Sequence, residues 1–180
     1  AARESGPIRK AELLNIASDC AFLADNPPAT FRQALQQIHF LFMGLYMESN
    51  AGGYSPGRMD QNLYPYYKRD VEAGILTDAE ALELIECMWI KFGEQIWYWN
   101  EPAATHYAGF CAFQNVCIGG VDMDGLDAVN PLSYLMLQAT IDTQMVQPSL
   151  SVRLSRKNPE DFFLKIAELI QTGSGFPAIY

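Results

Sequence analysis

The last third of the sequence alternates short apolar runs with amphipathic segments, and no other feature constrains the fold as strongly. The apolar runs read as strands over residues 113–118, 148–154 and 176–180. The segments between them read as helices that begin near Asn130 and Asp161. Strands that alternate with helices are typical of a parallel sheet with right-handed crossovers. The sequence therefore predicts an α/β fold, with a β-α-β-α-β order in this part.

Residues with helix-capping chemistry support these boundaries. Asn130 and Pro131 suit the N-cap and the first helical position of one helix. Asn158 and Pro159 repeat this pattern before the other helix, and Gly173 follows that helix. We therefore expect Asn158 to cap the second helix as Asn130 caps the first.

The first part of the chain is predicted to be helical. Apolar residues at helical spacing predict helices over residues 9–24, 31–48, 62–73 and 78–97. Thr30 with Gln33, and Thr77 with Glu80, form capping-box patterns at two of these starts. Asn100-Glu101-Pro102 is expected to break the last helix. We expect one domain, mainly helical over residues 1–99 and built of parallel strands and helices over residues 110–180.

Two features predict that this chain sits inside a larger body. Residues 35–47 leave almost no polar face, and a helix that is apolar all round is buried on all sides. The sequence also stops within an apolar strand pattern at Tyr180. We expect the chain to be an internal segment of a longer polypeptide.

The charge and hydrophobicity of the chain limit the kinds of molecule that it is expected to bind. Lys and Arg total 12 against 21 Asp and Glu, for a formal net charge of −9. Such a balance argues against a nucleic-acid surface and against docking on anionic lipid. No apolar run approaches the roughly 20 residues of a membrane span. We expect a cytoplasmic protein without a metal site, whose cysteines (Cys20, Cys87, Cys111 and Cys117) are small, buried, reduced side chains.

Several motifs invite a functional interpretation beside a structural one. Asp122, Asp124 and Asp127 surround a glycine, but their spacing does not fit a calcium loop, so a turn held by Asp side chains is favoured. Arg58 and Asp60 are expected to form either a buried ion pair that fixes a loop or a substrate contact, and the structural role is favoured. The glycines at 52, 53 and 57 lack a phosphate-binding pattern.

Aromatic side chains flank the first strand of the parallel part. Trp97, Trp99, His106 and Tyr107 are expected to pack between layers, with a pocket wall as the alternative. No carboxylate lies near His106 in sequence, so a role in acid or base catalysis is disfavoured.

The order of several motifs resembles the pyruvate formate-lyase-like glycyl radical enzymes. These are Glu48-Ser49-Asn50, Ser55-Pro56-Gly57-Arg58-Met59-Asp60-Gln61, Phe113-Gln114-Asn115-Val116-Cys117-Ile118-Gly119-Gly120 and Gln147-Pro148-Ser149-Leu150-Ser151-Val152-Arg153. The details are most similar to the dehydratase, choline trimethylamine-lyase and arylacetate decarboxylase branches. The resemblance runs through essentially the whole chain.

The resemblance implies a ten-stranded α/β barrel, of which this chain would form part. It also implies an anaerobic enzyme in which a glycyl radical, installed by a radical S-adenosylmethionine activase, generates a thiyl radical on a cysteine. That radical abstracts hydrogen from a small organic substrate, and a C–O, C–N, C–S or C–C bond breaks. Neither the Cys-x-Glu nor the Arg-Val-x-Gly-Tyr pattern of these parts occurs here, so we expect no catalytic residue in this chain and no activity from it alone.

Residue by residue, the resemblance assigns Phe113 to the pocket wall, and it assigns Ser55 and Tyr54 to a loop that reaches substrate in some relatives. The implied partners are the rest of the polypeptide, the activase, a small-molecule substrate and a second copy in a homodimer. Alternatives are a pyruvate formate-lyase-type acyltransferase, a radical enzyme that forms C–C bonds or decarboxylates, a non-catalytic α/β binding module and a nucleotide-binding α/β protein.

Overall fold

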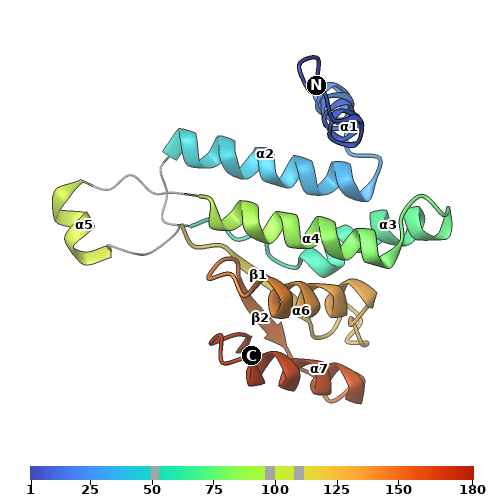
Figure 1. Ribbon diagram of the computed structural model, residues 1–180. Helices are drawn as coiled ribbons and strands as arrows, with labels where there is room; N and C mark the ends of the chain where they lie inside the picture. The colour runs from blue at the N-terminus through green and yellow to red at the C-terminus, as the bar shows by residue number, and fades with distance from the viewer. Residues whose placement is uncertain (50–52, 96–99, 108–111) are drawn as a thin grey trace.

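The structure, a computed structural model, describes residues 1–49, 53–95, 100–107 and 112–180 (Figure 1). Its helices are α1 (Pro7–Leu23), α2 (Phe31–Ser49), α3 (Met59–Glu72), α4 (Asp78–Gly93), α5 (Glu101–Tyr107), α6 (Pro131–Thr143) and α7 (Glu160–Gln171). Its strands are β1 (Asn115–Gly119), β2 (Ser149–Arg153) and β3 (Ala178–Ile179). Helices α2, α4, α6 and α7 follow one another as layers, and α1 extends away from them (Figure 1).

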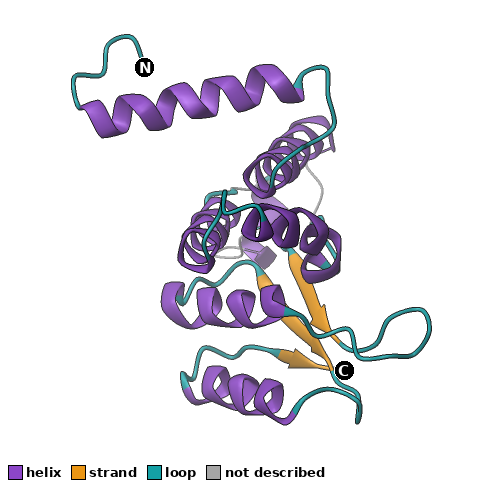
Figure 2. Ribbon diagram, turned by 90° about the vertical axis from the view of Figure 1, so that its right-hand side faces the viewer, coloured by secondary structure: helices purple, strands orange, loops and turns teal. Residues whose placement is uncertain are grey.

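The strands form the predicted parallel sheet, in the order β1-β2-β3. Helices α6 and α7 lie on the same side of the strands, and no helix of the described residues lies directly against the other side (Figure 2). Alternate strand residues point into the helical layer and are fully buried: Val116, Ile118, Leu150 and Val152. The sheet therefore has one apolar face that anchors it and one face free of helices.

A short segment extends the sheet beyond β1. Gly53 pairs with Phe113 and Gly57 pairs with Val116, both in the parallel sense. The Cys117 N–H donates to the Gly57 carbonyl at 2.8 Å. A Cβ at residue 53 would collide with the Phe113 carbonyl oxygen, so this close approach requires glycine. Residues 53–57 thus lie along the outer edge of β1.

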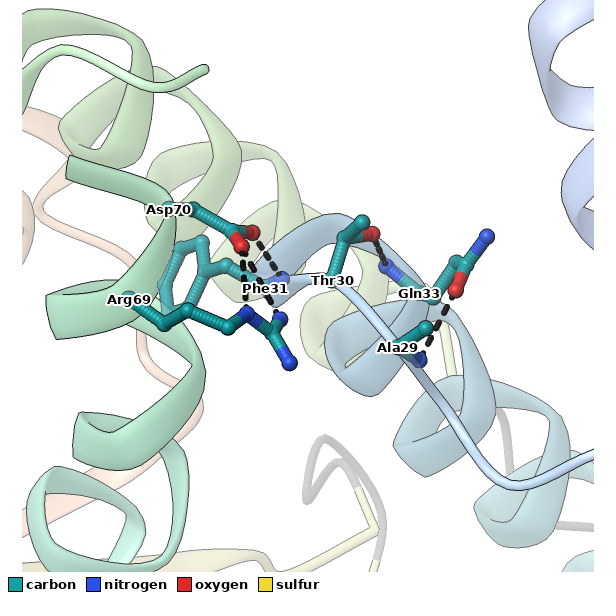
Figure 3. A network of polar contacts seen from close by, with 6 residues as sticks. All are labelled: Ala29, Thr30, Phe31, Gln33, Arg69 and Asp70. Atoms are coloured by element: carbon teal, nitrogen blue, oxygen red, sulfur yellow. Dashed lines mark hydrogen bonds and ion pairs between the residues drawn. The ribbon is translucent and has the colours of Figure 1, made fainter. Parts of the chain in front are cut away.

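The amino-terminal end of α2 shows how far its predicted capping box forms (Figure 3). The Gln33 N–H donates to the Thr30 hydroxyl at 3.2 Å, as the pattern predicts. The Gln33 side chain, however, accepts a hydrogen bond from the Ala29 N–H at 2.9 Å rather than from the N–H of the N-cap residue. The box is therefore confirmed in one half and shifted by one residue in the other.

A residue of α3 supplies the second cap of α2. The Asp70 carboxylate accepts the Phe31 N–H at 2.7 Å, and the Arg69 guanidinium donates to the other carboxylate oxygen at 2.9 Å (Figure 3). Asp70 is buried and Phe31 is fully buried. A carboxylate near the N-terminus of a helix also interacts favourably with the positive end of the helix dipole. This contact fixes α2 against α3. No local sequence pattern predicts it, because the two residues are far apart in sequence.

The helix α4 begins with the predicted capping box. The Glu80 N–H donates to the Thr77 hydroxyl at 3.2 Å, and the Thr77 N–H donates to the Glu80 carboxylate at 2.8 Å. The helix ends at Gly93 rather than at residue 97, and residues 96–99 lie outside the described part. Its buried Trp89 donates from Nε1 to the Thr140 hydroxyl of α6 at 3.0 Å.

Three other sequence predictions need correction. Helix α3 begins at Met59, earlier than residue 62, because Asp60 and Leu63 bury one side of its first turn. Asn100 does not merely end a helix: its side chain accepts the Ala103 N–H at 3.0 Å and opens α5. The cap predicted for Asn158 is wrong, because α7 begins after Pro159 without a side-chain cap.

The apolar helix α2 is not buried on all sides by the described residues. Phe42 is 6% exposed, but Leu41 is 58% and Met47 84% exposed, and Phe40 and Met43 are also exposed. The complete burial that the sequence predicts inside a larger body is not reached within the described part of this chain, because α3 and α4 cover only one face of α2.

The described cysteines are less buried than predicted. Cys87 is exposed, and Cys20 and Cys117 are half-buried. Burial still raises the pKa of the Cys87 thiol, with Glu83 and Glu86 adding to the effect. Cys111 lies outside the described residues. None of the described helices is long and apolar enough to cross a membrane.

Candidate functional site

The helix-free face of the sheet carries a row of polar side chains. The strand register places Asn115 beside Ser149, Cys117 beside Ser151, and Gly119 beside Arg153. Because paired residues of parallel strands share a face, these side chains lie opposite the buried apolar set. A sheet face without a covering helix, lined by hydrogen-bonding groups, is able to bind a polar ligand.

The residues assigned by resemblance lie together at the amino-terminal end of β1. Phe113 is 49% exposed and pairs through its backbone with Gly53, the residue before Tyr54. The Ser55 hydroxyl accepts the Asn115 N–H at 3.3 Å. The structure therefore brings Phe113 to the same corner of the sheet as Tyr54 and Ser55, from which it is far apart in sequence. Their contact with substrate stays a prediction.

Tyr54 is held by α2 rather than free to move. Its hydroxyl bonds the Ser49 hydroxyl and donates to the Leu45 carbonyl at 3.2 Å. Its ring packs edge-on against Tyr46, with centroids 5.1 Å apart. Tyr46 in turn accepts a hydrogen bond from the Gln114 amide at 3.1 Å, and burial raises the pKa of its hydroxyl. The Tyr46 hydroxyl in this corner is thus neutral.

Gln114 ties this corner to the strands. It is fully buried, and its N–H donates to the Gln147 side chain at 3.0 Å. The Ser149 N–H donates to the Gln114 carbonyl at 2.8 Å. Among the described residues, the side-chain oxygen of Gln114 has no hydrogen-bond partner. These bonds hold Phe113 and Asn115, its neighbours on either side, in a fixed position.

Asn115 and Ser151 form a pair across the strands. The Ser151 hydroxyl donates to the Asn115 carboxamide oxygen at 2.7 Å. Ser151 is 2% exposed, whereas Asn115 is half-buried. Sequence reasoning missed both residues as site candidates. The alternation of polar and apolar residues along both strands was the signal that could have identified them.

Beyond Asn115, this face carries the Cys117 thiol in the middle of β1 and the Arg153 guanidinium at the far end. Burial raises the pKa of the Cys117 thiol; Asp60 raises it further, and Arg153 and Arg58 oppose the shift. The thiol is therefore protonated at neutral pH and is not an activated nucleophile. Arg153 is exposed at the carboxyl end of β2. The face changes from aromatic and neutral at one end to cationic at the other.

Arg58 and Asp60 do not form an ion pair with each other. The Arg58 guanidinium donates to the carbonyls of Gly119, at 2.7 Å, and Val121, at 3.0 Å. Asp60 is fully buried and accepts the Gly119 N–H at 2.8 Å and the Ser133 hydroxyl at 2.7 Å. The predicted structural role is confirmed, but the predicted pairing is wrong because both side chains bind the turn after β1 instead. Burial raises the pKa of Asp60 despite these hydrogen bonds.

The acidic turn after β1 is a turn held by aspartate, as predicted. The Asp122 carboxylate accepts the N–H groups of Asp124, at 3.0 Å, and Leu126, at 2.8 Å. Asn158 bridges this turn to α7 by donating to the Gly120 carbonyl and to the Asp127 carboxylate, both at 2.7 Å. The Asn158 side-chain oxygen, the atom that would cap α7, instead accepts the Ser155 N–H at 2.7 Å.

Of the aromatic residues predicted to pack near β1, only part lies within the described residues. Trp97 and Trp99 lie outside the described residues. His106 lies in α5, where its Nδ1 is 3.1 Å from the Pro102 carbonyl and exposed to solvent.

A separate hollow of about 400 Å³ lies on the helical side, beside Tyr67, Asp78, Pro131 and Tyr134. It is built from α3, α4 and α6 and does not reach the helix-free face.

Comparison with known proteins identifies the family. A family model described as pyruvate formate lyase-like matches residues 1–180. Isethionate sulfite-lyase of Bilophila wadsworthia is 41% identical, over 96% of this chain and 21% of that protein. Trans-4-hydroxy-L-proline dehydratase of Clostridioides difficile is 37% identical, over 100% of this chain and 23% of that protein.

A solved structure shares the fold. The structure reported for 1,2-propanediol dehydration in Roseburia inulinivorans superposes with a TM-score of 0.94 at 37% identity, over 99% of this chain and 22% of that one. The chain thus spans about a fifth of the length of its relatives, which are glycyl radical enzymes with an α/β fold. The fold agrees with that structure over 99% of this chain, and the chain belongs to the pyruvate formate lyase-like family.

Proposed function

We propose that these residues form part of the barrel wall and substrate pocket of a glycyl radical lyase. The observation that carries this proposal is the corner at the amino-terminal end of β1, where Phe113 lies on the helix-free face next to Ser55 while Tyr54 packs on α2, within a fold shared along the whole chain with radical dehydratases. In such an enzyme the radical supplies hydrogen abstraction from substrate, after which a C–O, C–N, C–S or C–C bond breaks.

The residues of this chain would act by enclosing and orienting the substrate. An organic radical survives only where water and oxygen are excluded, which requires a closed and packed wall. The buried apolar face of the sheet supplies that packing, and the edge segment 53–57 extends the wall beyond β1. We infer that Phe113 gives the substrate an apolar surface and that Tyr54 and Ser55 hold the adjoining corner.

The radical-bearing parts are proposed to lie outside these residues. Cys117 is the one described cysteine on the helix-free face; Ile118 and Gly119 follow it rather than the x-Glu of the dehydratase pattern. Its raised pKa supports a protonated thiol that lines the wall. We propose a single pyruvate formate lyase-like domain in a cytoplasmic, anaerobic enzyme that acts as a homodimer and is activated by a radical S-adenosylmethionine enzyme.

The test uses the full-length protein that carries this sequence. It is treated anaerobically with an activase and S-adenosylmethionine, and the organic radical is quantified by electron paramagnetic resonance. It is then offered propane-1,2-diol, glycerol, trans-4-hydroxy-L-proline, isethionate, choline and 4-hydroxyphenylacetate, and products are measured by mass spectrometry. A glycyl radical signal with turnover of one of these compounds is expected. A full-length protein that gives neither radical nor turnover would contradict the proposal and favour a non-catalytic α/β module.

A further inference from the structure

On the helix-free face, the side-chain carboxamide of Asn115 uses only one of its two ends in hydrogen bonds to described residues. It points to the same side of β1 as Phe113, two residues earlier, because strand side chains alternate between faces. Its oxygen is taken by the Ser151 hydroxyl at 2.7 Å. Among the described residues, nothing accepts a hydrogen bond from its nitrogen, Nδ2. A half-buried amide with both N–H groups available is expected to meet water or a ligand.

Three contacts fix this carboxamide before any ligand arrives. The backbone N–H of Asn115 donates to the Ser55 hydroxyl at 3.3 Å, and its strand pairs with β2 beside Ser149. Ser151, which orients the side chain, is 2% exposed and buried within the sheet. The Ser151 bond sets which end of the amide is the donor, so Nδ2 projects away from Ser151 with little freedom. A donor held in place in this way loses little entropy on binding.

The surroundings define the chemistry of the group that it would bind. The nearest site residues are Phe113, which is apolar, and Ser55, which is neutral. The Cys117 thiol on the same strand is also neutral, since its pKa is raised. The cationic Arg153 lies opposite Gly119, at the other end of the strands. A neutral oxygen acceptor is therefore the complementary partner, and an anionic group would be drawn towards the arginine end.

We propose that Asn115 is a specificity-determining residue whose Nδ2 donates a hydrogen bond to a hydroxyl oxygen of the substrate, and that Ser151 is the positioning residue that orients it. This inference rests on the proposed function, because it places the substrate on the helix-free face. Phe113 would cover the carbon skeleton while Asn115 binds the oxygen, so a compound without that hydroxyl would lose the contact.

The experiment compares variants in the activated full-length enzyme. Asn115→Ala and Asn115→Leu are expected to lower kcat/KM by about tenfold, mainly through KM, since they remove one hydrogen bond made by the bound substrate. Asn115→Asp, which replaces a donor with an anionic acceptor, is expected to lower it further. Ser151→Ala is expected to give an intermediate loss that Ser151→Thr restores. Asn62→Ala is the matched control, because Asn62 is exposed on α3 and should leave all values unchanged.

Binding without turnover gives a second readout. The thermal shift of the unactivated full-length enzyme is measured with propane-1,2-diol and with propan-1-ol, which lacks one hydroxyl. In the wild-type protein and in Asn62→Ala, propane-1,2-diol should raise the melting temperature more than propan-1-ol does. In Asn115→Ala, this difference between the two thermal shifts should be smaller.

The outcomes separate the two proposals. A wild-type enzyme without radical or turnover refutes the proposed function, and the inference falls with it. An active wild-type enzyme whose Asn115→Ala variant carries the same radical content and keeps kcat/KM within twofold overturns the inference alone. A variant that loses radical content or melts early is replaced in the comparison by Asn115→Asp and Ser151→Ala, and unchanged kinetics in these two also overturn it.

Discussion

Asp60 provides the most direct test of how the turn after β1 is held. Its carboxylate is fully buried, and one oxygen accepts both the Gly119 N–H at 2.8 Å and the Ser133 hydroxyl at 2.7 Å. A hydrogen bond to a charged group contributes about 1.5–3 kcal/mol, so the two together contribute about 3–6 kcal/mol. The raised pKa of Asp60 means that desolvation of the charge outweighs the hydrogen bonds to the charged form, but removing the side chain would leave both buried donors without an acceptor. We expect Asp60→Ala to lower the free energy of unfolding by about 3 kcal/mol, a large share of typical domain stability.

Asp60→Asn is expected to cost less. Asparagine keeps an oxygen that can accept both donors, but as a neutral acceptor it binds them more weakly. It also removes the charge whose burial is unfavourable. We expect a loss of about 1–2 kcal/mol. Asp124→Asn serves as the matched control, because Asp124 is exposed in the same turn and should change stability by no more than about 0.5 kcal/mol.

The measurements are urea unfolding followed by tryptophan fluorescence and hydrogen exchange of the Gly119 amide. Trp89 is buried between α4 and α6 and reports their separation. The Gly119 amide should exchange faster in Asp60→Ala, since it loses its acceptor. If Asp60→Ala costs less than about 1 kcal/mol and the Gly119 amide stays protected, the reasoning about this carboxylate is wrong.

The pH dependence gives an independent check with a defined sign. The pKa of Asp60 is raised above its ordinary value of 3.8, so folding favours the protonated carboxyl. Its contribution to stability is full below pH 3.8 and is lost as pH rises through the higher pKa of the folded state. Asp60→Asn lacks this titration. The advantage of the wild type over Asp60→Asn in unfolding free energy should therefore shrink from pH 3 to pH 7, and an advantage that grows would contradict the assigned shift.

Two further substitutions test other contacts of the fold. Asp70→Ala should lower the free energy of unfolding by about 2 kcal/mol, because the Phe31 N–H at the start of α2 would lose a charged acceptor 2.7 Å away; an unfolding midpoint equal to that of the wild type in urea would contradict this role. Gly53→Ala should separate the edge segment from β1, since its methyl group would collide with the Phe113 carbonyl; faster exchange of the Cys117 amide, which bonds Gly57, would report the separation, and unchanged protection would argue against it.

The sequence predicted the elements of this fold where local chemistry decides them. The parallel β-α-β-α-β order, the Asn130 cap and the Thr77 box all follow from side chains a few residues apart. Residues 53–57 carry no periodic strand pattern in the sequence, because this strand edge is made through glycines and isolated pairs. Pairing of that segment with β1 depends on contacts some 60 positions along the chain, such as that between Ser55 and Asn115.

The site divides in the same way. Motif order alone pointed to Phe113, Tyr54 and Ser55, and the tertiary structure decided that they share one corner of the sheet. Arg58 and Asp60 looked like partners because they are neighbours in sequence, yet each binds the turn after β1. Local propensity fixes which segments are helices and strands, because it acts over a few residues. The hydrogen-bond partner of a buried polar side chain is an unpaired backbone group that the folded chain brings close to it. Which group that is depends on the whole tertiary structure.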